Sequence, residues 1–478
     1  MKRDLEEALV QIDTKDWKRI PLEYGHKTLE IAVPRDTTEI SMGSVPRIDN
    51  WQEEIERAFS NPIGSPKLEE IIKKKGKRPR DMTVSVTVSD ITRPVPYKGE
   101  GGILGPILRA LEFQGIKRRN IKIIVGTGIH RASTHEEKVQ MYGEEIVEHF
   151  TILDHDCVND DLLVSIGKTK RDTDVSVNKD FYSADLKIAT GLVESHFMTG
   201  ISGGRKAVCP GLVDVKTLEK FHGPYYLEDP NATNLILEGN PCHEEALEVA
   251  KTVGVDFIVN VTLDKDMRLT QVFAGDLVEA HIEAFEMIKA YAEIPLERQF
   301  DIVLTHGGYV GRDHYQTAKA GVSGIPAVKK GGVIIIAANN RDIDPIGSPE
   351  YKTLSHLLKL QGPDGYLDVL RHPHWRFTKD QWEPEVWAKP LRIVGEEGLI
   401  YCSGEIPKQD YAILPGTSGY EFLLDEFEGR SNLQKAQTMV QNALIYSICR
   451  LRKRNSEPMA CYIREGPYAI PVFRKSVL

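Results

Sequence analysis

Cysteines are few in this sequence, and none lies close enough to another to form a familiar motif. Six cysteines are spread over 478 residues, without any Cys-x-x-Cys pair among them. Structural zinc fingers and thioredoxin-like redox motifs depend on such closely spaced pairs, so both are excluded. The scattered thiols are expected to stay reduced.

Long apolar runs are also missing. The longest, such as the run at 333–338, are far shorter than the roughly 20 residues that a helix needs to cross a bilayer. The first 17 residues, MKRDLEEALVQIDTKDW, alternate charged with apolar side chains and lack the apolar centre of a secretory signal. We therefore expect a cytoplasmic protein that does not act at a membrane.

Basic residues are not in excess. The chain has 61 Lys and Arg against 70 Asp and Glu, which gives a formal net charge of −9. Proteins that bind nucleic acid through its phosphates usually carry a basic face, so a nucleic-acid partner is not expected. A local pocket for one small anion remains compatible with this balance.

Short β-branched runs alternate with helical patterns along the chain. Runs at 83–88, 121–125, 186–189, 300–304 and 332–336 each lead into a polar or glycine-rich loop. Strands that alternate with helices are typical of a mostly parallel sheet with helices on its faces. We predict an α/β fold with two Rossmann-like domains that flank a cleft, with ligands at the carboxyl ends of the strands.

Two helical stretches indicate how the domains would be joined. The stretches at 277–293 and 433–452 are interpreted as two bridging helices. An N-terminal cofactor-binding and catalytic domain is expected over 1–293, completed by 453–478. A C-terminal domain with substrate-orienting residues and the return helix is expected over 294–452.

Two of the loops combine polar groups with a strand end. In the loop Ser89-Asp90-Ile91-Thr92-Arg93, the guanidinium of Arg93 offers a planar fork for a phosphate or a carboxylate. A capped turn with an exposed arginine is the simpler alternative. The loop that begins Gly126-Thr127-Gly128 places His130 at the expected sheet edge. It lacks the third glycine of a dinucleotide-binding fingerprint, which argues against nicotinamide binding.

The richest motif is ESHFMTGISGGRKA at 194–207. Its glycines, its hydroxyls and the Arg205-Lys206 pair predict an anion-binding loop. A Walker A loop would need Gly-Lys-Ser/Thr where this chain has Arg-Lys-Ala, so a nucleotide triphosphatase is disfavoured. Lys206 could act as a nucleophilic amine or as a plain phosphate-binding lysine.

Further candidates follow along the chain. His130, His196 and His222 lie near glycine-rich loops but lack the HExxH spacing of zinc hydrolases. In the motif that opens the second domain, Tyr315 and Lys319 are four residues apart and would share one face of a helix. With Gln316 between them, these groups suit a small carboxylate and an adjacent oxygen.

Taken together and in order, these motifs resemble the lactate racemase family. The resemblance rests on SDITRP at 89–94, GTGIHRAST at 126–134, ESHFMTGISGGRKAVCPG at 194–211, His222, and GGYVGRDHYQTAK at 307–319. It implies racemisation or epimerisation at C2 of a small 2-hydroxy acid through a 2-keto acid, by proton-coupled hydride transfer to a nickel-pincer nucleotide. That cofactor is a thiolated pyridinium mononucleotide carrying Ni(II), and the enzymes that synthesise it would be partners.

The same resemblance implies a role for each site residue. Lys206 would hold the cofactor covalently, and His222 would be the nickel ligand of the protein. His130 and His196 would be the paired acid/base groups. Asp90, Arg93, Ser202, Gly203, Gly204 and Arg205 would line the cofactor pocket, and Tyr315, Gln316 and Lys319 would orient the substrate.

The chain departs from the family pattern in the last motif, where 310–314 is one residue shorter than expected. Arg312 and His314 are therefore expected to add positive charge near the substrate, and lactate itself is not assumed. Two alternatives remain open at this point. One is a non-catalytic small-anion binding protein or sensor, and the other is a nicotinamide-dependent 2-hydroxyacid dehydrogenase.

Overall fold

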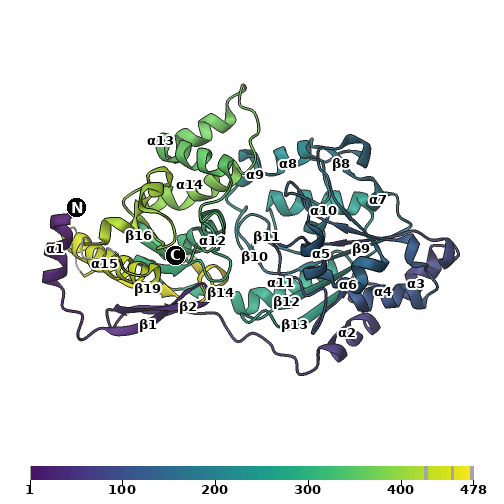
Figure 1. Cartoon of the computed structure of the whole chain (residues 1–478), viewed down its shortest axis with the longest axis horizontal. Coiled ribbons are helices and arrows are strands. Elements are labelled where there is room, and N and C mark those ends of the chain that lie inside the picture. The colour runs from purple at the N-terminus through teal and green to yellow at the C-terminus, as the bar shows by residue number, and fades with distance from the viewer. Residues whose placement is uncertain (1, 425–428, 454–456, 474–478) are drawn as a thin grey trace, which may run out of the picture. The chain divides into compact units, whose positions relative to one another are not determined.

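Two parallel-stranded sheets organise the protein, each in its own unit. The computed structural model describes residues 2–424, 429–453 and 457–473. One unit, here the central unit, is Ser44–Tyr291, and the other, the terminal unit, combines Met1–Gly43 with Ala292–Leu478 (Figure 1).

The central unit is built on a six-stranded sheet with the order β13-β12-β9-β4-β5-β6. All neighbours in it are parallel except β12 and β13, which pair antiparallel. Its strands are β4 (Val84–Val88), β5 (Ile121–Val125), β6 (Thr151–Asp154), β9 (Leu186–Leu192), β12 (Phe257–Leu263) and β13 (Leu269–Gly275), with the small pairs β7 (Leu163–Lys168) and β8 (Asp174–Asn178), and β10 (Ser195–His196) and β11 (Gly200–Ile201). The helices of this unit are α2 (Trp51–Ser60), α3 (Leu68–Lys74), α4 (Leu104–Phe113), α5 (His135–Tyr142), α6 (Glu144–His149), α7 (Lys179–Tyr182), α8 (Val215–Phe221), α9 (Pro224–Leu227), α10 (Pro241–Val253) and α11 (Glu279–Ala292), which ends at the unit boundary.

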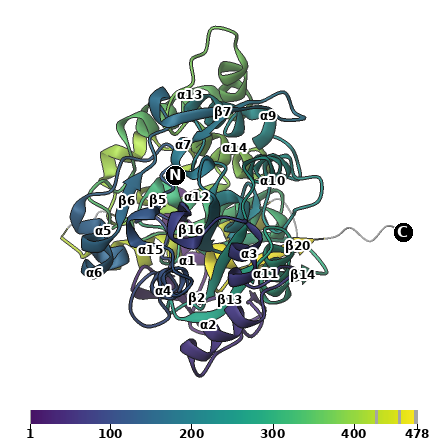
Figure 2. The ribbon, with the colours of Figure 1, turned by 90° about the vertical axis from the view of Figure 1, so that its right-hand side faces the viewer.

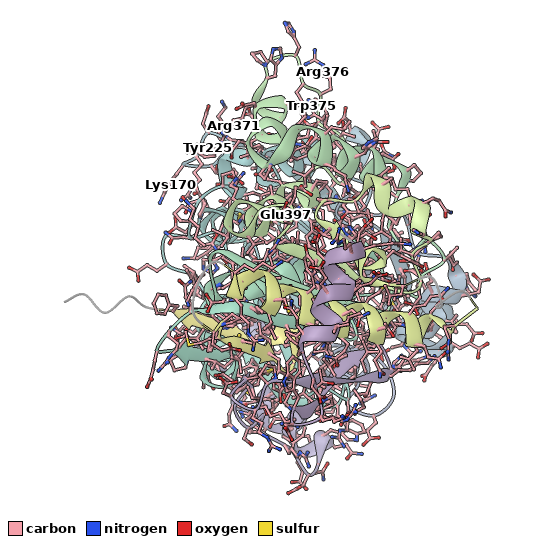
Figure 3. All side chains as sticks on the ribbon, turned by 90° about the vertical axis from the view of Figure 1, so that its left-hand side faces the viewer. Lys170, Tyr225, Arg371, Trp375, Arg376 and Glu397 are labelled. Carbon is pink, nitrogen blue, oxygen red and sulfur yellow. The ribbon has the colours of Figure 1, made fainter. Side chains whose placement is uncertain are left out.

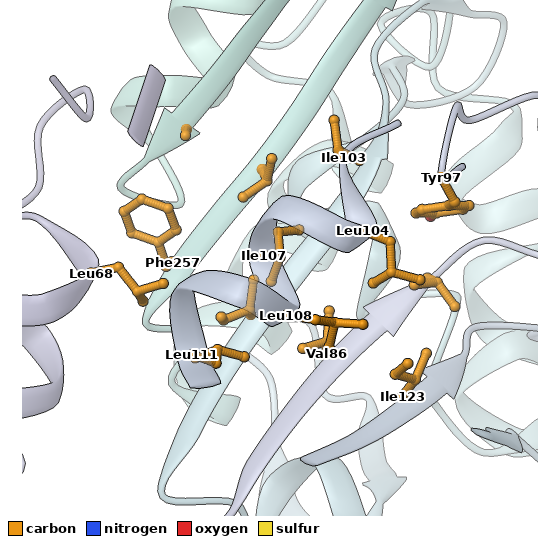
Figure 4. Close-up of a cluster of buried hydrophobic side chains, with 14 of the residues drawn as sticks. Leu68, Val86, Tyr97, Ile103, Leu104, Ile107, Leu108, Leu111, Ile123 and Phe257 are labelled. Atoms are coloured by element: carbon orange, nitrogen blue, oxygen red, sulfur yellow. The ribbon is translucent and has the colours of Figure 1, made fainter. Parts of the chain in front are cut away.

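Helix α4 illustrates how the helices pack on this sheet. Its apolar residues Leu104, Ile107, Leu108 and Leu111 recur at helical spacing, so they form one stripe. The stripe packs with strand residues such as Val86 in a single buried cluster (Figure 4). Helices α2 and α3 add residues to the same cluster, and Figure 2 gives a second view of these helices.

The terminal unit contains a second six-stranded sheet, which is entirely parallel. Its order is β18-β17-β16-β15-β19-β3. The strands are β3 (Thr38–Ile40), β15 (Phe300–His306), β16 (Val328–Ala337), β17 (Leu399–Cys402), β18 (Thr417–Ser418) and β19 (Ala460–Ile463), with the hairpin β1 (Lys18–Tyr24) and β2 (Lys27–Val33) and the pair β14 (Glu293–Leu296) and β20 (Ile470–Phe473). The helices are α1 (Lys2–Gln11), α12 (His314–Gly324), α13 (Pro349–Arg371), α14 (Trp382–Val394) and α15 (Asn432–Arg452).

Alternating side chains of β15 and β16 face two different layers. Ile302 and Ile335 lie in a buried cluster with residues of α15, α1 and the β1–β2 hairpin. Val303 and Ile334 face the other way, where Gly324 at the end of α12 lies close to both side chains. This alternation follows from the two-residue period of a strand that is buried on both faces.

The predicted α/β class and the predicted strands and helices are confirmed. The predicted division of the chain into two domains is not. The tail strand β19 pairs with β15 and β3, so the tail completes the terminal unit rather than the central one. The first 43 residues also belong to the terminal unit. Residues 454–456 and 474–478 of the expected completing segment lie outside the described residues.

The predicted return helix at 433–452 has a different place as well. It forms α15, whose apolar residues pack in the core of the terminal unit, so it is not a bridge. The chain passes between the units at Gly43/Ser44 and at Tyr291/Ala292 instead. Periodicity identified a long amphipathic helix, but it did not indicate which sheet would cover its apolar face. None of the helices in the described residues is long and apolar enough to span a membrane.

Candidate active site

The loop after β4 lies at the centre of the candidate site. In the sheet order, β4 has β5 on one side and β9 on the other, and the chain reaches these two neighbours by separate excursions. The strand order therefore reverses at β4, and ligands of open α/β sheets bind at such switch points beyond the carboxyl ends of the strands. Asp90, His130 and His196 follow β4, β5 and β9 respectively.

Asp90 holds the ring of His130. An oxygen of its carboxylate lies 2.7 Å from Nδ1 of His130, and its other oxygen accepts a hydrogen bond from the Thr92 backbone. Burial alone would raise the pKa of Asp90, but the hydrogen bond and charge of His130 and the Thr92 bonds outweigh it and lower the pKa. A neutral His130 ring thus donates from Nδ1 and presents the lone pair of Nε2.

We expect Asp90→Asn to reveal this interaction as a pH-dependent loss of stability. Because the pKa of Asp90 is lowered in the folded protein, its charged form stabilises the fold above the ordinary pKa of about 3.9. That contribution disappears as the pH falls through the lowered value. Urea unfolding should show a deficit of about 1–3 kcal/mol in the free energy of unfolding at pH 7, which shrinks below pH 4. Asp81→Asn, at an exposed carboxylate, is the control; a pH-independent deficit at Asp90 would contradict the prediction.

Arg93 connects the same loop to β9. Its Nη1 donates to a carboxylate oxygen of Glu194 at 2.9 Å, and both side chains are partly buried. The capped turn of the simpler alternative is present, because Asp90 accepts from the Thr92 N–H, but Arg93 is partly buried rather than exposed. The loop after β4 thus bonds to the loops of both neighbouring strands.

The glycines before His130 allow a close backbone approach. The N–H of Gly128 donates to the carbonyl of Gly211 at 3.0 Å, and a Cβ on Gly128 would lie 3.3 Å from the carbonyl oxygen of Pro210. Gly128 also has a φ of 56°, which disfavours other residues. The turn that carries His130 therefore packs directly on the segment that follows Lys206.

The loop at 202–206 is tightly enclosed. Gly203 and Gly204 have φ values of 75° and 51°, and a Cβ on Gly204 would lie 2.5 Å from the ring of His281. The Ser202 hydroxyl donates to the Leu192 carbonyl and accepts from the N–H of Glu194, so it fixes the loop against the end of β9. Lys206 stands in the short helical turn Gly204–Ala207 and is partly buried.

Arg205 points away from solvent. It is 2% exposed, and its Nη1 lies 2.9 Å and 2.7 Å from the two ring nitrogens of His243 on α10. Burial lowers the pKa of Arg205, and burial followed by the charge of Arg205 lowers the pKa of His243 to about 3. Among the described residues, Nε and Nη2 of Arg205 have no hydrogen-bond partner. A buried cation with two such donors is suited to an anion.

His222 lies at the carboxyl end of α8 and is kept neutral. Burial first, and then the nearby charge of Lys206, lower its pKa to about 3, with a smaller contribution from His130. Neutral imidazole is the form that binds metal ions. The structure thus brings Lys206 and His130 into electrostatic range of His222, which their spacing in sequence does not reveal.

The residues predicted to orient the substrate lie in the terminal unit. Helix α12 begins after Asp313, whose carboxylate accepts from the N–H of Gln316 at 2.7 Å. Tyr315 and Lys319 share one helix face, as the spacing predicted. The Nε1–H of Trp382 donates to the Tyr315 hydroxyl at 2.8 Å.

Arg312 and His314 were expected to add positive charge near the substrate, and the structure does not support this for either residue. His314 is 1% exposed, bonds through Nδ1 to the Tyr351 hydroxyl at 2.7 Å and stacks on Trp387. Burial lowers its pKa to about 3, so the expected positive charge on His314 is wrong. Arg312 pairs with Asp342 at 3.2 Å, which neutralises much of its charge.

Three tryptophans near this helix differ in their surroundings. Trp387 is buried in the core, and Trp382 contacts both Tyr315 and Phe377. Trp375 lies next to the exposed Arg376 on the chain that links α13 to α14 (Figure 3). Trp382 is the one of the three that reaches a predicted substrate residue in a described contact.

Several residues of the site escaped the sequence analysis. Asn260 accepts from the N–H of Gly204 at 3.2 Å, and Nε2 of His281 donates to the Ser202 carbonyl at 2.8 Å. Both lie far along the chain from the loop that they support. Asn260 sits within the apolar strand β12, and a polar residue in such a run was the one available signal. The described residues contain no cluster of three or more His, Cys, Asp or Glu arranged to hold a metal ion.

The fold and this grouping of histidines, lysine and glycine-rich loop are those of an α/β enzyme. The family described as Lactate racemase N-terminal domain matches residues 24–234. A lactate racemase of Lactiplantibacillus plantarum is 35% identical over 354 residues, which cover 74% of this chain and 80% of that protein. A lactate racemase of Thermoanaerobacterium thermosaccharolyticum is 31% identical over 377 residues, which cover 78% and 85%.

Two solved structures are also similar to this chain. The lactate racemase apoprotein from Thermoanaerobacterium thermosaccharolyticum matches with a TM-score of 0.79 and 26% identity, over 96% of this chain and 100% of that one. A protein of Thermotoga maritima shares the fold, with a TM-score of 0.58 and 18% identity over 87% of this chain and 100% of that one. The chain belongs to the lactate racemase family, and it is an isomerase of the racemase class.

Proposed function

We propose that the protein is a racemase or epimerase at C2 of a 2-hydroxy acid, and that it works with a nickel-pincer nucleotide attached to Lys206. The observation that carries the proposal is the neutral His222 within electrostatic range of Lys206 and His130. The residues proposed as metal ligand, tethering amine and acid/base imidazole thus all belong to the central unit. A protein that only binds an anion needs neither the tether nor the ligand.

The described residues fit this cofactor. His222 supplies the uncharged imidazole that a nickel ion prefers. Gly203 and Gly204 have no side chain to collide with their close neighbours, and glycine permits their positive φ values. The unpartnered donors of the buried Arg205 suit the single phosphate of a mononucleotide. Lys206 and His222 would hold the cofactor, with Asp90, Arg93 and the loop from Ser202 around it. When bound, the cofactor would accept the C2 hydrogen of the substrate as hydride and return it.

The protein would supply proton transfer and placement. His130 is held at Nδ1 by Asp90, so its Nε2 would take the proton of the substrate hydroxyl as the C2 hydrogen leaves. The planar 2-keto acid can then be reduced from either face. A second imidazole, that of His196, would serve the opposite face. General acid–base groups of this kind contribute about 10²–10⁴-fold to a rate.

Substrate orientation would come from α12. The Lys319 ammonium would bind the carboxylate of the 2-hydroxy acid, with Tyr315 and Gln316 beside it on the same helix. Since His314 is neutral and Arg312 is paired with Asp342, neither offers a strong site for a second carboxylate. Lactate, the substrate in the names of the two relatives, is therefore the first compound to test.

A panel of enantiopure 2-hydroxy acids tests the proposal. Protein produced together with the cofactor-synthesis enzymes should convert one enantiomer to a racemic mixture without added nicotinamide, as followed by chiral chromatography and optical rotation. Lactate is tested beside malate, an aryl-lactate and a sugar acid. A reaction that starts only when NAD is added would instead indicate a 2-hydroxyacid dehydrogenase. Binding without turnover of any compound would indicate an anion-binding protein.

A further inference from the structure

The ring of His196 is oriented by the backbone that follows it. Its Nδ1 accepts hydrogen bonds from the N–H of Met198 at 3.2 Å and from the N–H of Thr199 at 3.4 Å. The ring is 5% exposed and stacks on Phe197, with 4.8 Å between the centroids. A nitrogen that accepts backbone N–H groups carries no proton, so a neutral His196 has its proton on Nε2.

This arrangement is opposite to that of His130. Asp90 is an acceptor, which places the proton of a neutral His130 on Nδ1 and leaves a lone pair on Nε2. In their neutral forms, the two imidazoles that the proposed function pairs are therefore held as different tautomers. One presents a lone pair at Nε2, and the other presents an N–H at Nε2 that can donate a hydrogen bond.

The backbone that fixes His196 is itself held by Asn240. This residue is fully buried, and its Nδ2 donates to the carbonyl of Met198 at 2.9 Å and to the carbonyl of Ile236 at 2.9 Å. Its Oδ1 accepts from the N–H groups of Cys242 and His243 in the first turn of α10. The amide thus uses both of its donors and both of its acceptor sites, and it connects α10 to the loop between β10 and β11 (Figure 1).

The chain before Asn240 holds the other parts of the same loop. The N–H of Leu235 donates to the carbonyl of Gly200 at 2.9 Å, and the Ser195 hydroxyl donates to Oδ1 of Asn234 at 2.9 Å. A Cβ on Gly200 would lie 2.2 Å from the Ile236 carbonyl oxygen, so the backbones are in direct contact. Without the amide of Asn240, the Met198 peptide would lose its anchor in this otherwise buried region.

We infer that Asn240 is a positioning residue, which acts through the Met198 carbonyl to hold His196 as its Nε2–H tautomer. This rests on the proposed function only for its consequence in catalysis. The orientation of the ring is a property of the protein without substrate. Asn240 directly precedes Pro241, the first residue of α10. The same side chain therefore caps the helix and anchors the loop that carries Met198.

The test compares Asn240→Ala with the wild type in the full-length protein labelled with 15N-histidine. Long-range 1H–15N correlation spectra at pH 7.5 report which ring nitrogen carries the proton, and His196→Gln identifies the signals of His196. We expect the wild type to show an unprotonated Nδ1 and a protonated Nε2. In Asn240→Ala we expect a mixture of both tautomers. With cofactor-loaded enzyme, kcat should fall about 10- to 100-fold, because small misplacements of a reacting group have costs of this size, while KM should change less than about threefold.

Asn178→Ala is the matched control. Asn178 is another buried asparagine of the central unit that begins a helix, where its Oδ1 accepts from the N–H of Phe181. It should lower stability without changing the His196 signals. An unchanged His196 tautomer in Asn240→Ala, or the same tautomer change in Asn178→Ala, would overturn the inference. If Asn240→Ala does not fold, Asn240→Ser, which removes both Nδ2 bonds and can still begin the helix, is measured in the same way.

The two proposals fail separately in this experiment. A changed tautomer in Asn240→Ala supports the positioning role even if the wild type racemises none of the 2-hydroxy acids. An unchanged tautomer refutes that role even if the wild type is a fully active racemase.

Discussion

Replacing Lys206 by Arg is expected to abolish racemisation while the protein stays folded. Arginine keeps the positive charge next to the glycine-rich loop, but its delocalised guanidinium cannot form the amide-type bond that a lysine amine forms. Under the proposed function the cofactor carries the hydride chemistry, so losing its tether should lower kcat/KM by at least about a thousandfold. Mass spectrometry of the peptide that contains residue 206 should show the added mass of the cofactor in the wild type and none in the variant.

A second lysine provides the control for this substitution. Lys187 lies near the start of β9, at the opposite end of the strand from the candidate site, and its Nζ donates to the Ala184 carbonyl. Lys187→Arg should keep both the added mass and the activity. An unmodified wild-type peptide, from protein made with the cofactor-synthesis enzymes, would refute attachment at Lys206. Full activity in Lys206→Arg would refute its need.

Replacing His130 or His196 by Gln is expected to remove interconversion without removing the cofactor. Each glutamine fills a similar space but cannot exchange a proton near neutral pH, so each variant should lose about 10²–10⁴-fold in kcat. Nickel content and the mass at Lys206 should stay at the wild-type level, because neither histidine is proposed as the tether or as the metal ligand. Chiral chromatography started from each enantiomer separately measures the loss.

The two variants should also differ from each other. The rings are held by different partners, which are Asp90 for His130 and the Met198 and Thr199 backbone for His196. We therefore expect each variant to lose more activity with one enantiomer than with the other. His149→Gln, at an exposed position on α6 where Nδ1 of the ring bonds to the Glu145 carbonyl one turn earlier, should be fully active. Retention of full activity by either site variant would remove that histidine from the acid/base role.

Local patterns in the sequence predicted the elements well because the signals for them are local. The strand at 121–125 and the helix at 277–293 were expected, and the structure has β5 at Ile121–Val125 and α11 at Glu279–Ala292. The apolar spacing of each one is set by which of its faces is buried. The glycine-rich loops were recognisable for the same reason, since a positive φ at Gly203 is a requirement of one residue on its own backbone.

The partners of the site residues could not be predicted in the same way. Glu194 reaches Arg93 across 101 positions, and Asn240 reaches the loop of His196 across 42. The sequence contains each residue but no sign of the pairing, because the contact exists only when two strands lie side by side or a helix packs on a loop. The charge of His314 was misjudged for a similar reason, since only its burial against Trp387 and Tyr351 shows that it is neutral.

The low cysteine content, the missing apolar runs and the balanced charge excluded whole classes of protein, and the ordered motifs indicated the family by themselves. These are properties of composition and of neighbouring residues, which can be recognised without knowledge of the fold. Tertiary structure decided which unit each end of the chain completes: β19 and β3 are far apart in sequence, yet they pair in one sheet because parallel strands need only compatible edges. It also decided the state of the buried histidines, because desolvation and the charge of Lys206 act on His222 only once the chain has closed around it.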